Sequence, residues 1–219
     1  MLFNSYIFIF IFLPITLGVF FIIGRRSHYR IALGWLVAAS LFFYGYWNPI
    51  YLLLIGSSMT VNFQIGRWLN RSPDFLPICR RSLLITGITV NLTVLGFFKY
   101  ANFIADQLSY VSELPLGLPE IVLPLGISFF TFQKIAYLVD AYHGKIAGYS
   151  FLQYCLFVLF FPQLIAGPIV HPREILPQFA NRRVFQPSYS NLSVGLTYFV
   201  LGLFKKVVLA DRAGAWLIN

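Results

Sequence analysis

Three polar side chains interrupt one long apolar run, and they are the first residues in this sequence that could do chemistry. Gln133, Lys134 and Asp140 all lie between Ile121 and Tyr142. A charge at the centre of a bilayer costs about 2.5–3.5 kcal/mol, so such residues face protein or water and mark functional sites by default. The structural alternative is that Lys134 and Asp140 reach the two interfaces or pair with other helices, while Gln133 hydrogen-bonds a neighbouring helix. The sequence is compatible with both.

His171 is the sharpest single candidate, because an imidazole can exchange a proton near neutral pH. It stands just beyond Gly167-Pro168, at the end of an apolar run that also holds Gln163. Proline frees backbone carbonyls that must find partners inside protein, so we expect Gly167-Pro168 to end a helix with His171 near a polar cavity. No second histidine, cysteine or serine motif accompanies His171, and a lone interfacial histidine is more often structural.

Two adjacent lysines in the last apolar run, Lys205 and Lys206, have two interpretations. They could form a site for a lipid head group or a phosphate, or they could end the helix and complement its dipole. The cysteines, Cys79 and Cys155, lack the spacing of a metal site, and Cys155 is expected to be a small core residue without a disulfide. The sequence has no nucleophile elbow, phosphate-binding loop or zinc-protease motif.

The composition is that of an integral membrane protein. Of the 219 residues, 58% are hydrophobic and 11% are charged, whereas soluble domains are about 45–50% apolar and about 25% charged. The net charge of +9 comes from basic residues grouped between apolar runs. This grouping indicates topology signals and contact with anionic lipid head groups, and we expect no nucleic-acid partner.

The apolar runs predict an all-α, polytopic transmembrane helix bundle of about six to seven membrane segments, forming a single membrane domain over residues 1–219. The predicted runs are Leu2–Ile23, Ile31–Trp47, Ile50–Gly66, Ser82–Phe98, Ile121–Tyr142, Tyr149–Phe161 and Leu192–Ala210. The first run lacks the features of a cleavable signal and is expected to be a mature helix. Lys99–Glu120 is expected to contain a short amphipathic piece, and Pro168–Pro187 to be a connecting loop.

The basic loops set the predicted topology but leave one conflict. The positive-inside rule places Gly24–Arg30 and Arg67–Arg81 in the cytoplasm and the Asn48-Pro49 turn outside. If every later run crosses the membrane, the basic residues Arg182 and Arg183 fall outside. If Ile121–Tyr142 is broken or re-entrant instead, they return to the cytoplasm, and we favour this alternative because Pro124 and Gly126 interrupt that run.

Six motifs in chain order give the sequence a family likeness. They are Trp47–Leu52, Phe97–Phe103, Leu123–Gln133, Tyr137–Tyr142, Phe161–Val170 with its continuation Leu176–Phe179, and Gly202–Arg212. Together they resemble the N-terminal half of a bacterial membrane-bound O-acyltransferase, of the kind that modifies alginate, peptidoglycan or teichoic acid. The likeness runs over nearly the whole chain.

The resemblance implies transfer of an acyl group, with acetyl the first expectation, from a cytoplasmic donor such as acetyl-CoA or an acyl carrier. The acceptor would be a hydroxyl of an exported polysaccharide or cell-wall polymer, and no bound cofactor is expected. A multi-pass protein of the bacterial inner membrane is implied, together with membrane lipids and a periplasmic acetyltransferase as partners. Helices around a funnel would enclose the site.

The resemblance also limits the assignment of a catalytic residue. The family's catalytic histidine lies in the second half of its members, and neither His143 nor His171 corresponds to it, so we expect no catalytic residue in this chain. The expected substrate path, or polar interior, consists of Gln133, Lys134, Asp140, Gln163, His171, Lys205 and Lys206. A transporter-like conduit and a non-catalytic remnant are the competing functions.

Overall fold

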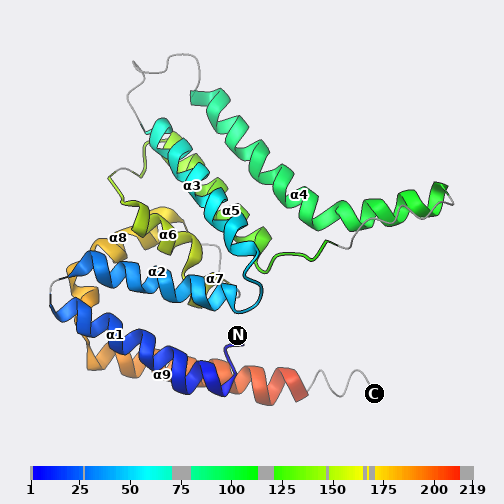
Figure 1. Cartoon of the computed structure of the whole chain (residues 1–219). Helices are drawn as coiled ribbons and strands as arrows, with labels where there is room; N and C mark the ends of the chain where they lie inside the picture. The colour runs from blue at the N-terminus through cyan, green and yellow to red at the C-terminus, as the bar shows by residue number, and fades with distance from the viewer. Residues whose placement is uncertain are drawn as a thin grey trace. The chain divides into compact units, whose positions relative to one another are not determined.

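The computed structural model describes residues 2–26, 28–70, 80–112, 121–146, 148–164, 167 and 171–212. All regular secondary structure in these residues is helical, as predicted (Figure 1). The α-helices are α1 (Leu13–Arg25), α2 (Tyr29–Gly45), α3 (Tyr51–Leu69), α4 (Arg80–Ser112), α5 (Ile127–Tyr142), α6 (Phe151–Leu159), α7 (Phe161–Leu164), α8 (Pro172–Ala180) and α9 (Tyr189–Phe204). Two π-helical stretches, η1 (Phe8–Phe12) and η4 (Lys205–Ala210), and the 3-10 turn η3 (Arg182–Phe185) complete the list.

Three helical stretches in the described residues are long and apolar enough to cross a membrane: Phe8–Arg25, Arg80–Val111 and Tyr189–Ala210. Helix α2 is apolar but shorter. The protein is therefore a multi-pass, all-α membrane protein. The chain divides into two compact units, residues 1–36 with 181–219 and residues 37–180. That they act as one membrane domain stays a prediction.

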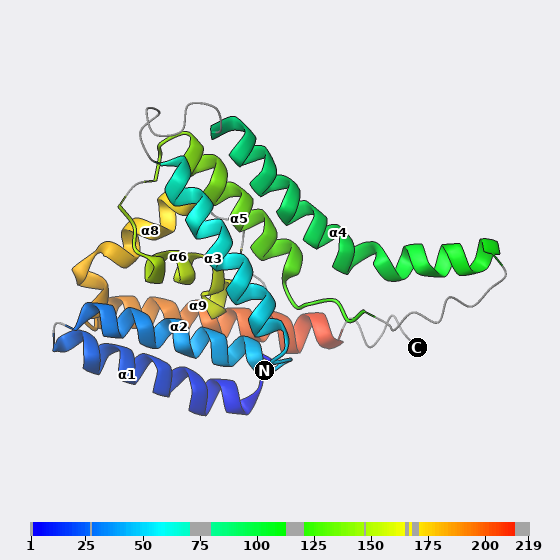
Figure 2. The ribbon, with the colours of Figure 1, turned by 45° about the horizontal axis from the view of Figure 1, so that its top comes forward.

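Helices α3, α4 and α5 form the centre of the unit 37–180, and they lie side by side in both views (Figures 1 and 2). Helices α3 and α5 run in the same direction. The Tyr51 hydroxyl, at the start of α3, donates to the Val122 carbonyl just before α5, and Gly66 near the end of α3 packs on Tyr137 in the second half of α5. Helix α4 runs in the opposite direction, and its first residue, Arg80, donates to the carbonyl of Tyr142 at 2.7 Å.

A reciprocal pair of buried amides joins α3 to α4. Asn62 Nδ2 donates to Asn91 Oδ1 at 3.3 Å, and Asn91 Nδ2 donates to Asn62 Oδ1 at 2.6 Å. Each amide also donates to its own helix, to the carbonyls of Ser58 and Gly87 respectively. Both side chains are therefore satisfied within the protein, which is what a polar group needs in an apolar surrounding.

Helix α4 differs from the expected span over Ser82–Phe98 followed by a separate amphipathic piece. It is one helix of 33 residues, Arg80–Ser112. The sequence between these ends has no proline, so nothing forces a break. At about 1.5 Å per residue the helix exceeds the roughly 30 Å of a hydrocarbon core, and it bends in both views (Figures 1 and 2).

The break predicted in Ile121–Tyr142 is confirmed. Residues 121–124 have no regular structure, and α5 begins only at Ile127 after Gly126, whose φ of 70° is left-handed. Asn102 of α4 holds the irregular part in place by donating to the Ile121 carbonyl at 2.8 Å and accepting from its N–H at 3.0 Å. The backbone groups freed by the break are thus partly satisfied inside protein.

The expected span Tyr149–Phe161 is wrong. Helix α6 has 9 residues, so it reaches only about 14 Å along its axis, less than half of a hydrocarbon core. The chain breaks at Phe160 (φ −51°, ψ 109°), before Pro162, and continues as the 4-residue helix α7. The last six residues of α6, Tyr154–Leu159, are buried, so protein rather than lipid covers them.

Helices α6 and α7 pack along α5. Near one end of α5, Tyr154 packs on Tyr137 with ring centroids 4.4 Å apart. At the other end, a Cβ on Gly126 would lie 3.1 Å from the Leu164 carbonyl oxygen. His171 lies 3.9 Å from Asp140, near the C-terminal end of α5. The re-entrant course expected for Ile121–Tyr142 stays a prediction.

The region predicted as a loop, Pro168–Pro187, contains two short helices instead. Helix α8 starts at Pro172, a residue suited to the first helical position, and buries Leu176 and Phe179 on one side. Charged residues on its other side obscured this amphipathic pattern in the sequence. The turn η3 follows, where the Asn181 side chain accepts from the Arg183 N–H at 3.0 Å and Phe185 is buried.

The other unit, residues 1–36 with 181–219, is built on a close contact between η3 and the end of α1. A Cβ on Gly24 would lie 2.9 Å from both the Cβ and the carbonyl oxygen of Phe185, so only glycine admits this approach. Phe185 also packs on Phe20 and Tyr29, with centroids 5.4 and 4.8 Å away. The basic ends of α1 and η3 are therefore neighbours. Helices α9 and η4 of this unit bury no residue.

This contact makes a topology prediction. Replacing His28 and Val184 singly by cysteine, in a background without Cys79 and Cys155, should give two sites that a membrane-impermeant maleimide reaches from the same side. A cysteine at Ile50, next to the turn expected outside, should react from the opposite side. If the cysteine at one of positions 28 and 184 reacts in intact cells and the other reacts only after the membrane is opened, the packing of η3 on α1 is contradicted.

Candidate functional site

Lys134, one of the predicted intramembrane charges, is held as a structural group. Its side chain is 1% exposed, donates to the Ser58 hydroxyl of α3, and lies 4.7 Å from the ring centroid of Phe130. A hydroxyl and an aromatic face are partners that a buried ammonium can use. Lys134 thus binds α5 to α3, as in the structural alternative.

Gln133 lies on another face of α5 and is fully buried at 0% exposure. Among the described residues, neither its amide nitrogen nor its amide oxygen has a hydrogen-bond partner. A buried polar group left unpaired costs about 1–3 kcal/mol, so its retention in a packed interior needs an explanation. One turn further along, Tyr137 packs on Tyr154, whose hydroxyl is also buried and unpaired within the described residues.

Asp140 continues this face of α5, because residues 133, 137 and 140 follow the helical spacing of four and three. Its side chain is 8% exposed, and its Oδ2 atom faces His171 Nδ1 at 3.9 Å. This is too long for a hydrogen bond, and Oδ2 has no other such partner in the described residues. Two candidates 31 positions apart in sequence thus form one carboxylate–imidazole pair, with the 56% exposed His171 at its open side.

The remaining predicted site residues do not join this group by any described contact. Gln163 lies half-buried in α7, and its carbonyl accepts the N–H of Gly167 at 3.0 Å. Lys205 and Lys206 belong to the other unit, where both are exposed on η4. Lys206 pairs with Asp211. Helix α9 ends at Phe204 with Lys205 as its C-cap, and the chain continues as the π-helical stretch η4, so both interpretations of these lysines stay predictions.

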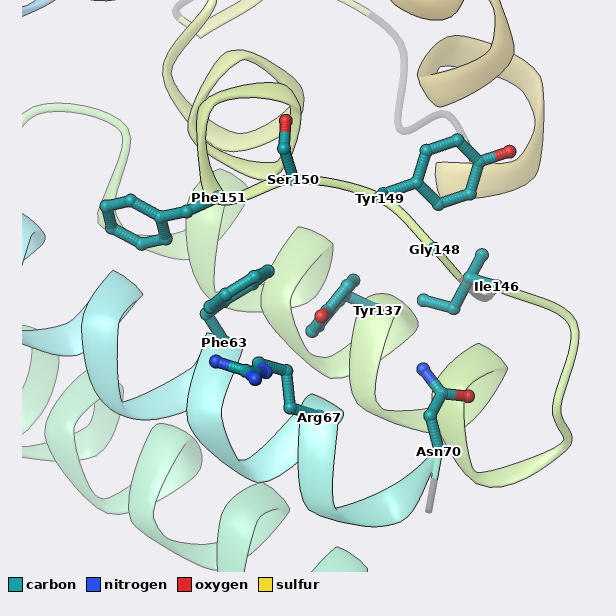
Figure 3. A pocket seen from close by; sticks show the side chains of 9 residues that line it. All are labelled: Phe63, Arg67, Asn70, Tyr137, Ile146, Gly148, Tyr149, Ser150 and Phe151. Carbon is teal, nitrogen blue, oxygen red and sulfur yellow. The ribbon is translucent and has the colours of Figure 1, made fainter. Parts of the chain in front are cut away.

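A pocket of about 570 Å³ opens beside the C-terminal half of α3 (Figure 3). Arg67 of α3 and Asn70, directly after α3, supply a guanidinium and an amide to it, and aromatic rings form most of the rest of its wall (Figure 3). Its lining is Phe63, Arg67, Asn70, Tyr137, Ile146, Gly148, Tyr149, Ser150 and Phe151. Tyr137 therefore belongs both to this pocket and to the polar face of α5.

Sequence reasoning missed Arg67 and the amides Asn62 and Asn91 as structural or site residues. In the sequence, Arg67 indicates only topology, as part of a basic loop. Its spacing of four residues from Phe63, near the end of a helix, is the signal that could have indicated a site. The two asparagines stand alone in apolar runs, and such amides commonly bond across helices. Which amide pairs with which depends on the register of α3 against α4, which the sequence does not contain.

Two expectations about the chemistry of the chain can be compared with these residues. Cys155 is a free cysteine buried at 3% exposure, which confirms its prediction as a small core residue. Cys79 lies outside the described residues. Among the residues that the structure describes, no group of three or more His, Cys, Asp or Glu side chains could hold a metal ion.

The fold and the residues of α5 define a multi-pass membrane protein with buried polar side chains in its interior. Comparison with known families identifies it further. Residues 80–216 match the model of the membrane-bound O-acyltransferase family, MBOAT, and the chain belongs to this family. The predicted resemblance is thereby confirmed.

The chain is similar to relatives that modify bacterial polymers. It is 39% identical to a peptidoglycan O-acetyltransferase of Helicobacter pylori, over 97% of this chain and 45% of the relative. It is 37% identical to the probable alginate O-acetylase AlgI of Pseudomonas aeruginosa, over 98% of this chain and 41% of the relative. The chain thus spans less than half the length of these relatives. No solved structure matches it.

The amide of Gln133 has no hydrogen-bond partner among the described residues, whereas those of Asn62 and Asn91 bond each other, so we expect their replacement by leucine to affect stability differently. Gln133→Leu removes two unpaired buried polar atoms, so it should leave the free energy of unfolding unchanged or raise it by about 1 kcal/mol. Asn62→Leu strands Asn91 and should lower stability by about 1–3 kcal/mol. Thermal unfolding in detergent measures both. A larger loss for Gln133→Leu than for Asn62→Leu would show that Gln133 has a structural partner.

Proposed function

We propose that this chain forms part of an enzyme that transfers an acetyl group to hydroxyls of an exported polysaccharide or cell-wall polymer. Its family supports acyl transfer, and the names of its relatives, an O-acetyltransferase of peptidoglycan and a probable O-acetylase of alginate, support the acyl group and the class of acceptor. The proposal includes a location in the bacterial inner membrane, where a periplasmic acetyltransferase could receive or continue the product.

The observation that carries this proposal is the polar face of α5. Gln133 and Asp140 present buried polar atoms that have no hydrogen-bond partner among the described residues, and Tyr137 stands between them. In a lipid-facing or purely structural helix such atoms only cost free energy. In a path for a hydroxyl-bearing acceptor they can hydrogen-bond the substrate. We assign Gln133, Asp140 and His171 to this path as groups that position substrate or pass a proton, and Lys134 to its structural support.

The pocket at Arg67 is suited to the acyl donor. It lies at the end of α3 that carries the basic loop, which the positive-inside rule places in the cytoplasm. Acyl donors of the acetyl-CoA and carrier-protein kinds carry phosphate groups, and a guanidinium binds phosphate through paired hydrogen bonds. The aromatic wall of Phe63, Tyr149 and Phe151 can cover the apolar part of such a donor.

The Asp140–His171 pair should affect acetyl transfer. In membranes containing the full-length protein, Asp140→Asn should lower kcat/KM for the acceptor by about tenfold or more, because a charge facing the imidazole is lost. Combining it with His171→Gln should add little, since partners in one interaction are not additive.

Glu174→Gln is the matched control, since Glu174 is an exposed acid on α8 close in sequence to His171. Removing a surface charge should change the rate by no more than about twofold. Fully additive losses for Asp140→Asn and His171→Gln would contradict their action as a pair. Substrate flux in proteoliposomes without acetyl transfer would contradict the enzyme itself.

Arg67→Gln tests the donor pocket separately. It should raise the KM for the acetyl donor about tenfold while leaving kcat near its original value, because the lost contact is made equally in ground and transition states. Arg81→Gln, another exposed arginine of the same basic region that does not line the pocket, serves as control. An unchanged donor KM in Arg67→Gln would remove this pocket as the donor site.

A further inference from the structure

A second concave site lies in the unit formed by residues 1–36 and 181–219, which holds none of the residues assigned to acyl transfer. It is a pocket of about 360 Å³ lined by Gly24, Arg25, Tyr29, Gln186 and Pro187. It exists because Phe185 seats η3 against Gly24, which brings the chain after η3 to the turn between α1 and α2.

The surroundings of this pocket are cationic and lack a counter-charge. Five arginines belong to the two segments that meet here: Arg25, Arg26, Arg30, Arg182 and Arg183. The stretches 1–36 and 181–219 contain a single acidic residue, Asp211, and it pairs with Lys206. None of the five arginines forms a salt bridge within the residues that the structure describes.

Tyr29 organises the cations around the pocket. Its ring packs on Phe185 at 4.8 Å and carries the guanidinium of Arg182 over it at 5.2 Å from the centroid. An arginine stacked on an aromatic ring keeps its N–H groups free to point outward at an anion. Arg25 reaches the same pocket from the last turn of α1.

We propose that this pocket binds the phosphate group of an anionic membrane phospholipid. Arginine pairs with phosphate through two parallel hydrogen bonds, and the site lies at the end of the apolar helix Phe8–Arg25, where head groups of the bilayer are found. Basic pockets between membrane helices are suited to such head groups, and anionic lipids are concentrated in the cytoplasmic leaflet. The proposal does not depend on acyl transfer.

The test measures lipid preference of the full-length protein reconstituted in nanodiscs of phosphatidylcholine with increasing phosphatidylglycerol. Native mass spectrometry of the released protein should show retained phosphatidylglycerol in preference to phosphatidylcholine. The double variant Arg25→Gln with Arg182→Gln should weaken this preference at least about tenfold. Arg81→Gln with Arg173→Gln removes the same charge from exposed positions of α4 and α8 in the other unit, and should keep the preference.

Gly24→Ala gives an independent check, because it keeps every charge but forces Phe185 away from α1. It should also reduce the lipid preference, whereas Gly34→Ala, at a position with open space around it, should not. Unfolding temperatures in phosphatidylcholine alone identify variants that fail to fold, and Arg25→Lys with Arg182→Lys should then recover part of the preference. Equal retention of both lipids by the original protein, or equal loss in the Arg81/Arg173 control, would overturn the proposal. So would displacement of the lipid by millimolar glycerol phosphate, which would assign the site to a soluble phosphate.

Discussion

Every polar group inside a membrane needs a partner. Helix α5 carries some buried polar side chains that have such partners and others that do not. On one face, Lys134 reaches Ser58, and next to it the amides of Asn62 and Asn91 satisfy each other between α3 and α4. These contacts join three helices and satisfy the side chains that make them. On another face, Gln133 and Asp140 have buried atoms without a hydrogen-bond partner among the described residues. The first face is therefore suited to stability and the second to binding.

The packing around the second face explains how such atoms stay buried. Helix α6 contributes six consecutive buried residues, Tyr154–Leu159, and it is too short to cross the membrane. It covers α5 from inside the protein, so its apolar residues replace lipid and keep lipid away from Gln133 and Tyr137. The helix ends at Phe160, before Pro162, and His171 lies 3.9 Å from Asp140. A straight spanning helix at this place would expose the same face to hydrocarbon, at a cost of several kcal/mol for each unpaired group.

The sequence predicted the helical class, the break before Ile127 and the candidates Gln133, Asp140 and His171, because composition, Pro/Gly positions and isolated polar residues are local signals. It failed where a helix depends on contacts between distant residues. Helix α8 forms because Leu176 and Phe179 find apolar partners, and α6 is short because protein covers it. Asp140 and His171 are 31 positions apart in sequence, and their proximity depends on tertiary packing that no spacing in the sequence encodes. Arg67 was visible in the sequence, but its role depends on the aromatic wall that α5 and the chain before α6 bring to it.

The contact of Phe185 with Gly24 brings the basic residues at the end of α1 close to those of η3, although the two segments are far apart in sequence. The positive-inside rule expects basic residues to gather on one side of the membrane, so this packing favours a topology in which Arg182 and Arg183 lie on the same side as Arg25. In the unit 37–180, α6 has 9 residues and is too short to cross a hydrocarbon core. A topology in which α6 does not cross agrees with the grouping of the basic residues, and it stays a prediction.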